Sequence, residues 1–343
     1  MAGNSTLRAS GLSVEQKELL RLLVGKEGIE LKALRTIPRR ERRDRAPLSF
    51  AQQRLWFLEQ FQPDSSAYNI ATALLLVGRL DVSVLGRTMT EVVCRHEVLR
   101  TVFNEGDDEA AQQVILPRSP VQLPLVDLAS LGPAATAAAR PVVDAEAVRP
   151  FDLRKGPLFR AAVFRLDEAR HVVLLTVHHI VSDGWSSGLL IKELAEIYKA
   201  LSAGGSSPLP ELPIQYADFA VWQRQHLSGS VLERELSYWR GKLSHLPTLA
   251  LPTDFPRPLA KTHHGAVCHL VLPPRLTADL RSLVRDGEAS PFMLLLAGFN
   301  VLLSRYSGQE DLAVGTPIAN RTQVETEGLV GFFVNSLVLR TDL

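Results

Sequence analysis

The sequence predicts a mixed α/β protein built in two parts, and three observations carry that prediction. Segments with helical periodicity alternate along the chain with short, β-branched apolar runs that are typical of strands. The 343 residues are enough for two lobes that each bury a core. A segment rich in Pro, Gly and Ser, 202–213, separates two halves that contain the same mixture of elements.

Composition excludes several classes of protein. Hydrophobic content of 46% and charged content of 22% are ordinary for a soluble globular chain. A net charge of +1 gives no indication of a nucleic-acid or anionic membrane partner, and no apolar run reaches the length of a membrane span. The two cysteines, Cys94 and Cys268, lack metal-ligand spacing and are expected to be buried thiols. We therefore expect a cytoplasmic protein with no metal site.

The first 46 residues are expected to precede the globular body. Ser13 and Gln16 form a capping box before a short amphipathic helix that ends near Val24. Six of the residues from Arg35 to Arg45 are arginine, and without interleaved aromatic residues they predict a solvated linker. The expected domains are 1–46 (leader helix and arginine-rich linker), 47–201 (N-terminal lobe) and 202–343 (inter-lobe linker and C-terminal lobe).

The first half is expected to contain helices and strands in alternation. A second capping box, Ser49 with Gln52, begins a helix with a broad buried apolar face, which Pro63 ends. An alanine-rich helix at 134–147 is expected to break or kink at Pro141. The other expected elements are strands at Ile70–Val77, Val98–Phe103 and Gln113–Leu116, a helix at Asp81–Cys94, and a hairpin of Leu158–Leu166 with His171–His178.

The second half begins after a helix that starts at Gly184 and extends to about Leu201. Ser290 caps a later helix that has Pro291 at its first position and ends near Tyr306. The remaining expected elements are helices at Ala217–His226, Val231–Leu243 and Thr277–Arg285, and strands at Ala266–Leu272, Asp311–Thr316 and Phe332–Leu339.

The stretch from His171 to Ser186 concentrates the titratable side chains. A buried strand ends at two histidines, and His179 is followed at i+4 by Asp183 and then by Gly184. Histidine is the side chain best suited to move a proton near neutral pH. Taken alone, the pattern is weak and favours a structural histidine and a helix-capping aspartate over a catalytic pair.

If His179 faces a cavity, it can assist a nucleophile that attacks a carbonyl, which is acyl-transfer chemistry. The segment Gly184–Gly188 matches Gly-x-Ser-x-Gly, but we expect direct transfer between two bound substrates rather than an acyl-enzyme. Asp183 suits an architectural role, because a carboxylate in apolar surroundings needs a cation such as arginine. Gly184 would let a substrate approach closely and leave helix N–H groups facing a developing oxyanion.

Five segments together resemble the condensation domains of nonribosomal peptide synthetases, which belong to the chloramphenicol-acetyltransferase-like acyltransferases. They occur in the family's order over about Pro47 to Leu343. The five segments are Ser49–Leu58, Arg95–Phe103, His178–Gly184, Tyr216–Gln223 and Val330–Ser336.

The resemblance implies two similar lobes of mixed sheet and packed helices in a V shape, with the active site in a tunnel between them. It implies that His179 acts on the attacking amine, and that His178 and Asp183 are mostly structural. Arg321 is the favoured partner of Asp183, and Arg100 is the second choice. The other residues expected at the site are Gly184 and the motif residues Ser49, Gln52, Arg54, Trp56, Trp185, Ser186 and Asn335.

The resemblance also implies the substrates and partners. No cofactor is expected to bind the chain directly, since carrier proteins deliver thioesters on phosphopantetheine arms. We expect the donor carrier to act in trans, because a leader starting at Met1 precedes the first motif, and adenylation and carrier domains to follow downstream. The chain stops after the fifth motif, so an incomplete second lobe is expected. A non-catalytic carrier-docking module and a free-standing acyl-CoA-dependent acyltransferase remain as alternatives.

Overall fold

The computed structural model describes residues 36–63, 65–106, 110–256 and 266–343. Their contacts form two compact units. Unit 1 holds the described residues up to Ser228 together with Ala319–Asn335, and unit 2 holds Gly229–Ile318 with Ser336–Leu343. The helix predicted at Ser13–Val24 lies outside the described residues.

Unit 1 is built on a four-stranded sheet with the strand order β2-β7-β6-β5. β6 and β7 form the predicted antiparallel hairpin, and β2 pairs antiparallel with the other edge of β7. β5 runs parallel to β6 but pairs only with its last three residues. The bounds are Asn69–Val77 for β2, Leu125–Asp127 for β5, Phe159–Arg165 for β6 and Arg170–His178 for β7.

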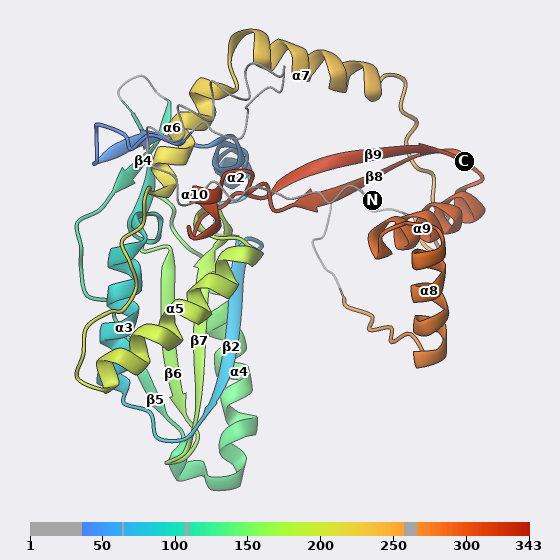
Figure 1. The fold of residues 1–343 in the computed structure, drawn as a ribbon. Helices are drawn as coiled ribbons and strands as arrows, with labels where there is room; N and C mark the ends of the chain where they lie inside the picture. The colour runs from blue at the N-terminus through green and yellow to red at the C-terminus, as the bar shows by residue number, and fades with distance from the viewer. Residues whose placement is uncertain (1–35, 64, 107–109, 257–265) are drawn as a thin grey trace. The chain divides into compact units, whose positions relative to one another are not determined.

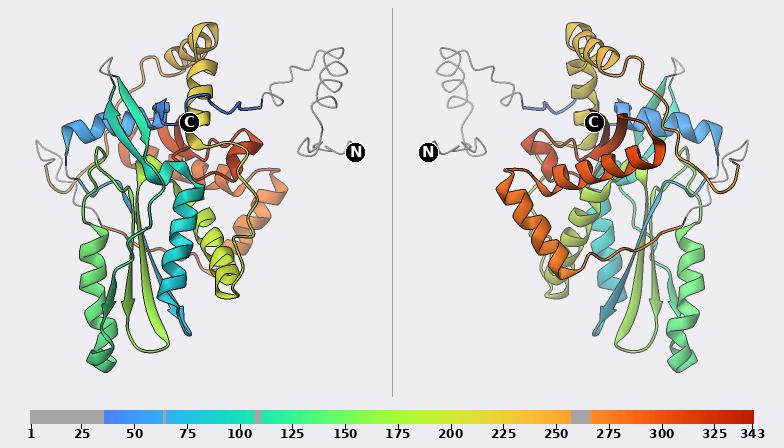
Figure 2. Two further views of the ribbon diagram at one scale, coloured as in Figure 1. Left: turned by 90° about the vertical axis from the view of Figure 1, so that its left-hand side faces the viewer. Right: turned by 90° about the vertical axis from the view of Figure 1, so that its right-hand side faces the viewer.

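Helices cover both faces of this sheet (Figures 1 and 2). α3 (Val82–Arg95) and α5 (Gly184–Ser202) pack together on one face, where their apolar side chains join the main core. α4 (Ala135–Ala147) covers the other face after a 3-10 turn, η3 (Ala129–Ala134). α4 continues through Pro141, so the helix is not broken there.

A smaller sheet with the order β1-β4-β3 completes unit 1, together with α2, α6 and the 3-10 turn η2. The capping box of Ser49 and Gln52 is present, but the broad buried face predicted for α2 is wrong: Phe57 and Phe61 are 59% and 69% exposed. The expected strand at Val98 begins three residues later, because η2 turns Val98 and Leu99 into the core. The bounds are Arg45–Pro47 for β1, Phe50–Phe61 for α2, Glu97–Arg100 for η2, Thr101–Glu105 for β3, Ala111–Ile115 for β4 and Tyr216–His226 for α6.

The predicted linker at 202–213 does not end unit 1. The chain returns to the core after it, because Ile214, Tyr216 and Phe219 are buried in the main apolar cluster. The contacts therefore keep α6 with unit 1 and divide the chain at Ser228.

Unit 2 contains three helices and a two-stranded sheet of β8 with β9 among the described residues. Ser290 caps α9 with Pro291 in the first turn, as predicted. The strand expected at Ala266–Leu272 is wrong: the segment has no regular structure, and Val267 and Val271 are 80% and 87% exposed. A β-branched run forms no strand without a neighbour to pair with. The bounds are Gly229–Lys242 for α7, Pro274–Asp286 for α8, Pro291–Ser307 for α9, Asp311–Ile318 for β8 and Asn335–Asp342 for β9.

Two further expectations for the second half need correction. The prediction of two buried thiols is wrong, since Cys268 is exposed on the irregular segment and Cys94 is only partly buried on α3. The strand expected from Phe332 begins instead at Asn335, because Phe332 and Phe333 are buried in unit 1.

In the described parts of the chain, no single helix is long and apolar enough to cross a membrane; α8 and α9 meet that test only as a pair bent by 108°.

The prediction that the arginine-rich segment is a solvated linker is wrong at Arg40, which is buried. Its guanidinium forms ion pairs with Asp218 at 2.7 Å and with Glu97 at 2.6 Å. Its backbone N–H also donates to Asp218, 3.1 Å away. The side chains of Arg40 and Asp218 are 4% and 0% exposed, so this ion pair lies inside unit 1 and ties the segment to α6.

Removing Arg40 tests the importance of this buried pair. We expect Arg40→Ala to lower the free energy of unfolding by about 3–5 kcal/mol, because the carboxylate of Asp218 stays buried without its cation. Urea unfolding of the full chain measures the change. Arg42→Ala is the matched control: Arg42 pairs with Asp44 on the surface, where both side chains are more than 60% exposed, and no measurable change is expected. Equal effects of the two substitutions would contradict the assignment.

Candidate active site

Asp183 is the anchor of the candidate site. It caps the N-terminus of α5 and is fully buried. Its Oδ1 accepts hydrogen bonds from the backbone N–H of Ser186 at 2.8 Å, the Ser186 hydroxyl at 2.7 Å and Nη2 of Arg321 at 3.1 Å. Its Oδ2 accepts from the backbone N–H of Phe333 at 3.1 Å. The carboxylate thus joins the start of α5 to the segment 319–335, far away in sequence.

Arg321 neutralises Asp183, and their side chains are 2% and 0% exposed. Its Nη2 also donates to the Ser186 hydroxyl at 2.9 Å, and its Nη1 donates to the carbonyls of Thr326 and Leu329. Burial lowers the pKa of Arg321, and the neighbouring Asp183 opposes that shift. The guanidinium therefore organises its own loop as well as the ion pair.

Aromatic side chains enclose this ion pair. The guanidinium carbon of Arg321 lies 4.1 Å from the centroid of the Phe333 ring and 5.6 Å from that of Trp185. The indole N–H of Trp185 donates to the carbonyl of Glu327 at 3.0 Å. Glu327 belongs to α10 (Val324–Glu327), so Trp185 attaches α5 to the same loop.

A chain of hydroxyl groups holds Phe332 from the other side. The carbonyl of Phe332 can only accept, so the Tyr216 hydroxyl donates to it, at 2.6 Å. The Ser49 hydroxyl, 2.7 Å from the same oxygen of Tyr216, therefore acts as the donor to Tyr216. Burial raises the pKa of Tyr216, which keeps the phenol neutral. Gly331 allows this contact, because a Cβ there would lie 2.0 Å from Cδ2 of Tyr216.

His179 lies in the 3-10 turn η4 (His179–Val181) between β7 and α5. Its Nδ1 is 2.8 Å from the carbonyl of Ser182, which can only accept, so Nδ1 carries the proton and Nε2 carries the lone pair. The ring meets Phe332 edge-on, with centroids 4.7 Å apart. His179 is partly exposed, and no described residue forms a hydrogen bond to its Nε2. The lone pair of Nε2 is therefore available to accept a proton.

His178 has the opposite arrangement. Its Nδ1 accepts from the backbone N–H of Ile180 at 3.1 Å, so the proton of the neutral ring is on Nε2, which is buried without a hydrogen-bond partner. The ring packs near Tyr68 and edge-on against Phe151. Burial, followed by the neighbouring His179, lowers the pKa of His178 to about 3. His178 is therefore a neutral packing residue at physiological pH.

Several other predicted residues lie next to this cluster. The amide Nε2 of Gln52 donates to the carbonyl of Ile180 at 3.2 Å, which fixes η4 against α2. The guanidinium of Arg54 lies 6.0 Å from the centroid of Phe332, the ring that contacts His179. Gly184 is exposed, and apart from its chain neighbours and the backbone of α5 no atom lies within 4 Å of where its Cβ would be.

Three predicted residues are not part of the cluster. Arg100 is not the partner of Asp183. It is the last residue of η2, and its guanidinium donates to the backbone carbonyl of Leu116 instead. Trp56 is buried in the main core, where its ring centroid lies 6.5 Å from that of Phe103. Asn335 is the exposed first residue of β9.

The sequence did not single out some residues that the structure brings to the site. Tyr216, Gly331 and Phe332 are the clearest, although each lies in a motif segment. A buried pair behind them, His96 Nε2 with Glu193 Oε2 at 2.7 Å, also supports the loop, since the backbone N–H of Val330 points to Nδ1 of the same histidine at 3.4 Å. No group of three His, Cys, Asp or Glu side chains that could hold a metal ion occurs in the described ranges.

Comparison with known proteins places this site in a family context. The sequence model of the Condensation domain family matches residues 42–343. One of the linear gramicidin synthase polypeptides of Brevibacillus parabrevis is 47% identical over 329 residues, which are 95% of this chain but 4% of that protein. Phosphinothricin tripeptide synthetase PhsB of Streptomyces viridochromogenes is 45% identical, over 87% of this chain and 25% of that protein. The chain thus spans a small part of these relatives.

Solved structures show the same fold. The X-domain from teicoplanin biosynthesis matches with a TM-score of 0.81 and 30% identity, over 90% of this chain and 68% of that one. The first condensation domain of the calcium-dependent antibiotic synthetase, solved with a substrate analogue, matches with a TM-score of 0.72 and 27% identity, over 87% and 69%. The predicted fold class, mixed α/β of the chloramphenicol-acetyltransferase type, is confirmed.

Two glycines of the site allow a matched test of packing. We expect Gly331→Ala to destabilise the chain by about 1–3 kcal/mol, because the new methyl group would overlap the buried Tyr216 ring. Gly184→Ala, where the methyl group meets open space, should keep the stability of the unaltered chain. Thermal and urea unfolding measure both variants. A Gly331→Ala chain as stable as Gly184→Ala would refute the close approach.

The pKa of His178 predicts an acid-sensitive fold. A native histidine with a pKa of about 3 stays neutral between pH 6.5 and about pH 3, whereas the same histidine in the unfolded chain takes up a proton over this range. Stability therefore falls as pH drops through 6.5 towards 3, by up to about 1.4 kcal/mol per pH unit from this residue. His178→Gln should reduce that slope between pH 6.5 and 5 in urea unfolding, and His269→Gln on an exposed segment controls for loss of a histidine. Equal slopes for His178→Gln and the unaltered chain would contradict the prediction.

Proposed function

The chain belongs to the condensation-domain family of nonribosomal peptide synthetases, and from that premise we propose that it forms an amide bond between two thioester-bound substrates, with His179 as the catalytic residue. The observation that supports this most strongly is the fixed tautomer of His179. Its Nδ1–H is held by the Ser182 carbonyl, and its Nε2 is left without a hydrogen bond from the described residues.

The proposed step is a direct acyl transfer. The amine of the acceptor attacks the carbonyl carbon of the donor thioester, so that a C–N bond forms and the C–S bond breaks. Nε2 of His179 takes the proton that the amine loses and returns it to the leaving thiolate. While the ring is protonated, the hydrogen bond from Nδ1 to the Ser182 carbonyl stabilises the imidazolium.

The surroundings of His179 support positioning of both substrates. Phe332 fixes the orientation of the imidazole, and the open space at Gly184 leaves room for a thioester to approach the start of α5. Asp183 is proposed as a positioning residue, because Ser186, Arg321 and the backbone N–H of Phe333 donate to its two carboxylate oxygens. Its carboxylate is thus unavailable for a proton relay.

Membership of the family supports a proposal for the substrates. Relatives include synthases of linear gramicidin and of a phosphinothricin tripeptide. We propose that carrier domains present both substrates as phosphopantetheine thioesters, and that adenylation and carrier domains are the working partners. The chain itself is proposed to hold no resident cofactor.

A docking module without turnover is the second candidate. One structural match supports it: the teicoplanin X-domain, with a TM-score of 0.81, has been solved in complex with OxyB. A member of this fold can therefore serve as a binding partner for another protein.

Substitution of His179 separates these candidates. With aminoacyl-loaded donor and acceptor carriers, we expect His179→Ala to lower the rate of amide formation at least 100-fold, because general-base assistance contributes about 10²–10⁴-fold. The unfolding midpoint should stay unchanged, since the ring is partly exposed. Product is measured by mass spectrometry, with His226→Ala as the control variant. Equal rates for His179→Ala and the unaltered chain would refute the catalytic role.

Two other outcomes identify the alternatives. Saturable carrier binding without product from the unaltered chain would favour the docking module. Product from soluble acyl-CoA and a free amine, with no carrier present, would identify a free-standing acyltransferase.

A further inference from the structure

Two contacts limit the orientation of the His179 ring. Its Nδ1 donates to the Ser182 carbonyl at 2.8 Å, and the ring meets Phe332 at a centroid distance of 4.7 Å and an interplanar angle of 64°. One hydrogen bond to a carbonyl fixes the distance of Nδ1 but tolerates a broad range of ring directions. The direction in which Nε2 points therefore depends on where the Phe332 ring lies.

The peptide unit between Phe332 and Phe333 orients the backbone that carries this ring. Its N–H donates to Asp183 Oδ2 at 3.1 Å, and its C=O accepts from the Tyr216 hydroxyl at 2.6 Å. The two groups lie on opposite edges of the planar peptide, so the two hydrogen bonds together oppose its rotation. Without the Tyr216 hydroxyl, the peptide would lose the bond at its carbonyl edge.

Tyr216 can hold this carbonyl in one place because its own ring is fixed. The residue is 1% exposed, and its ring centroid lies 4.9 Å from that of Phe333, edge-on, and 5.7 Å from that of Phe219. The first turn of α6, which Tyr216 begins, is anchored by the buried ion pair of Asp218 with Arg40. The hydroxyl group therefore has a fixed position in unit 1.

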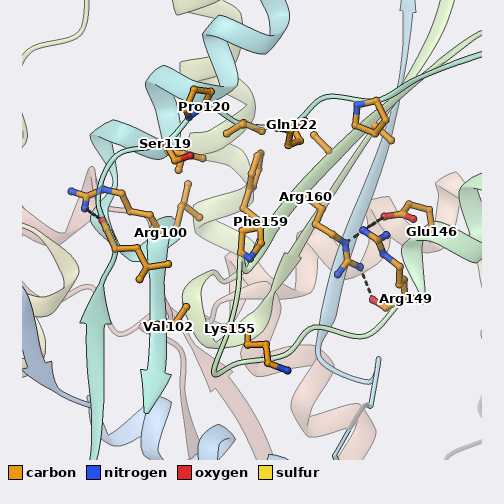
Figure 3. Close-up of a pocket in the computed structure, with 18 of the residues that line it drawn as sticks. Arg100, Val102, Ser119, Pro120, Gln122, Glu146, Arg149, Lys155, Phe159 and Arg160 are labelled. Atoms are coloured by element: carbon orange, nitrogen blue, oxygen red, sulfur yellow. Dashed lines mark hydrogen bonds and ion pairs between the residues drawn. The ribbon is translucent and has the colours of Figure 1, made fainter. Parts of the chain in front are cut away.

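The Tyr216 hydroxyl is not placed to touch a substrate. It accepts from the Ser49 hydroxyl at 2.7 Å and donates to the Phe332 carbonyl, so its single proton is engaged. A cavity of about 1000 Å³ lies elsewhere in unit 1, beside β6, α4 and the segment 116–124, and Ser49, Tyr216 and Phe332 do not line it (Figure 3). An effect of this hydroxyl on chemistry at His179 has to pass through the residues that it holds.

Resting on the amide-forming function proposed above, we propose that Tyr216 is a positioning residue for that reaction. Its hydroxyl orients the peptide that follows Phe332, the Phe332 ring limits the orientation of the His179 imidazole, and Nε2 is thereby directed at the acceptor amine. A tyrosine with a purely structural role would stabilise the fold without affecting the direction of Nε2.

Tyr216→Phe removes the hydroxyl and keeps the buried ring. With loaded carriers, we expect kcat for amide formation to fall at least about tenfold, because a misplacement of about 1 Å can cost roughly 100-fold in rate. KM for the carriers should not change, since the hydroxyl touches no substrate. Tyr198→Phe is the matched control: near the C-terminal end of α5, it removes a hydroxyl that accepts from the backbone N–H of Asp81 at 3.0 Å. This control should keep the kcat of the unaltered chain.

A double-mutant cycle tests whether Tyr216 acts through Phe332. Phe332→Leu removes the ring that meets His179, so we expect it to lower kcat as well. Adding Tyr216→Phe to Phe332→Leu should then cause no further loss, because both changes act on the same contact. Full multiplication of the two separate losses would contradict the proposal.

NMR of the full chain tests the positioning without turnover. We expect a nuclear Overhauser effect between the imidazole C–H protons of His179 and the ring protons of Phe332, which Tyr216→Phe should weaken and Tyr198→Phe should retain. If His179→Ala forms amide at the full rate, the proposed function fails, and this effect still tests the role of Tyr216. The positioning role is overturned if Tyr216→Phe leaves the Overhauser effect unchanged, or if it leaves kcat unchanged while His179→Ala is slow.

Discussion

A carboxylate removed from water must be neutralised and hydrogen-bonded, and in this protein that requirement falls on Asp183. The donors that satisfy it come from two places in the sequence: the first turn of α5, through Ser186, and the loop that carries Arg321 and Phe333. The loop must therefore lie against α5, and this places Phe332 on His179 and its carbonyl on Tyr216. One buried charge thus fixes the geometry around the proposed catalytic base.

The two adjacent histidines differ because they face different backbone groups. Nδ1 of His179 donates to the backbone carbonyl of Ser182, whereas Nδ1 of His178 accepts from the backbone N–H of Ile180. The neutral rings therefore carry their protons on opposite nitrogens. His179 keeps a lone pair on Nε2 beside the open space at Gly184, and His178 buries its Nε2 among aromatic rings. These two contacts account for the different roles proposed for His179 and His178.

Local signals made part of this structure predictable. The capping box at Ser49, the N-cap at Ser290, the β6–β7 hairpin and the helix after Asp183 each depend on residues close in sequence. The family resemblance, rather than a local signal, pointed to Arg321 as the partner of Asp183. Features that depend on distant partners escaped prediction. Arg40 was assigned to a solvated segment because Asp218 and Glu97 are far away in sequence, and the strand at 266–272 was expected from composition without a neighbour to pair with. The need for glycine at position 331 arises from the Tyr216 ring, which is distant in sequence and contacts Gly331 only in the folded chain.

The protonation state of His179 is the central claim, and nitrogen-15 NMR of the histidine-labelled full chain measures it most directly. The signals of His179 are assigned by their loss in His179→Ala, and spectra are recorded at pH 8. The structure predicts a protonated Nδ1 and an unprotonated Nε2 for His179. A neutral ring with its proton on Nε2 would contradict the account, because the lone pair would then face the Ser182 carbonyl and no base would face the substrate.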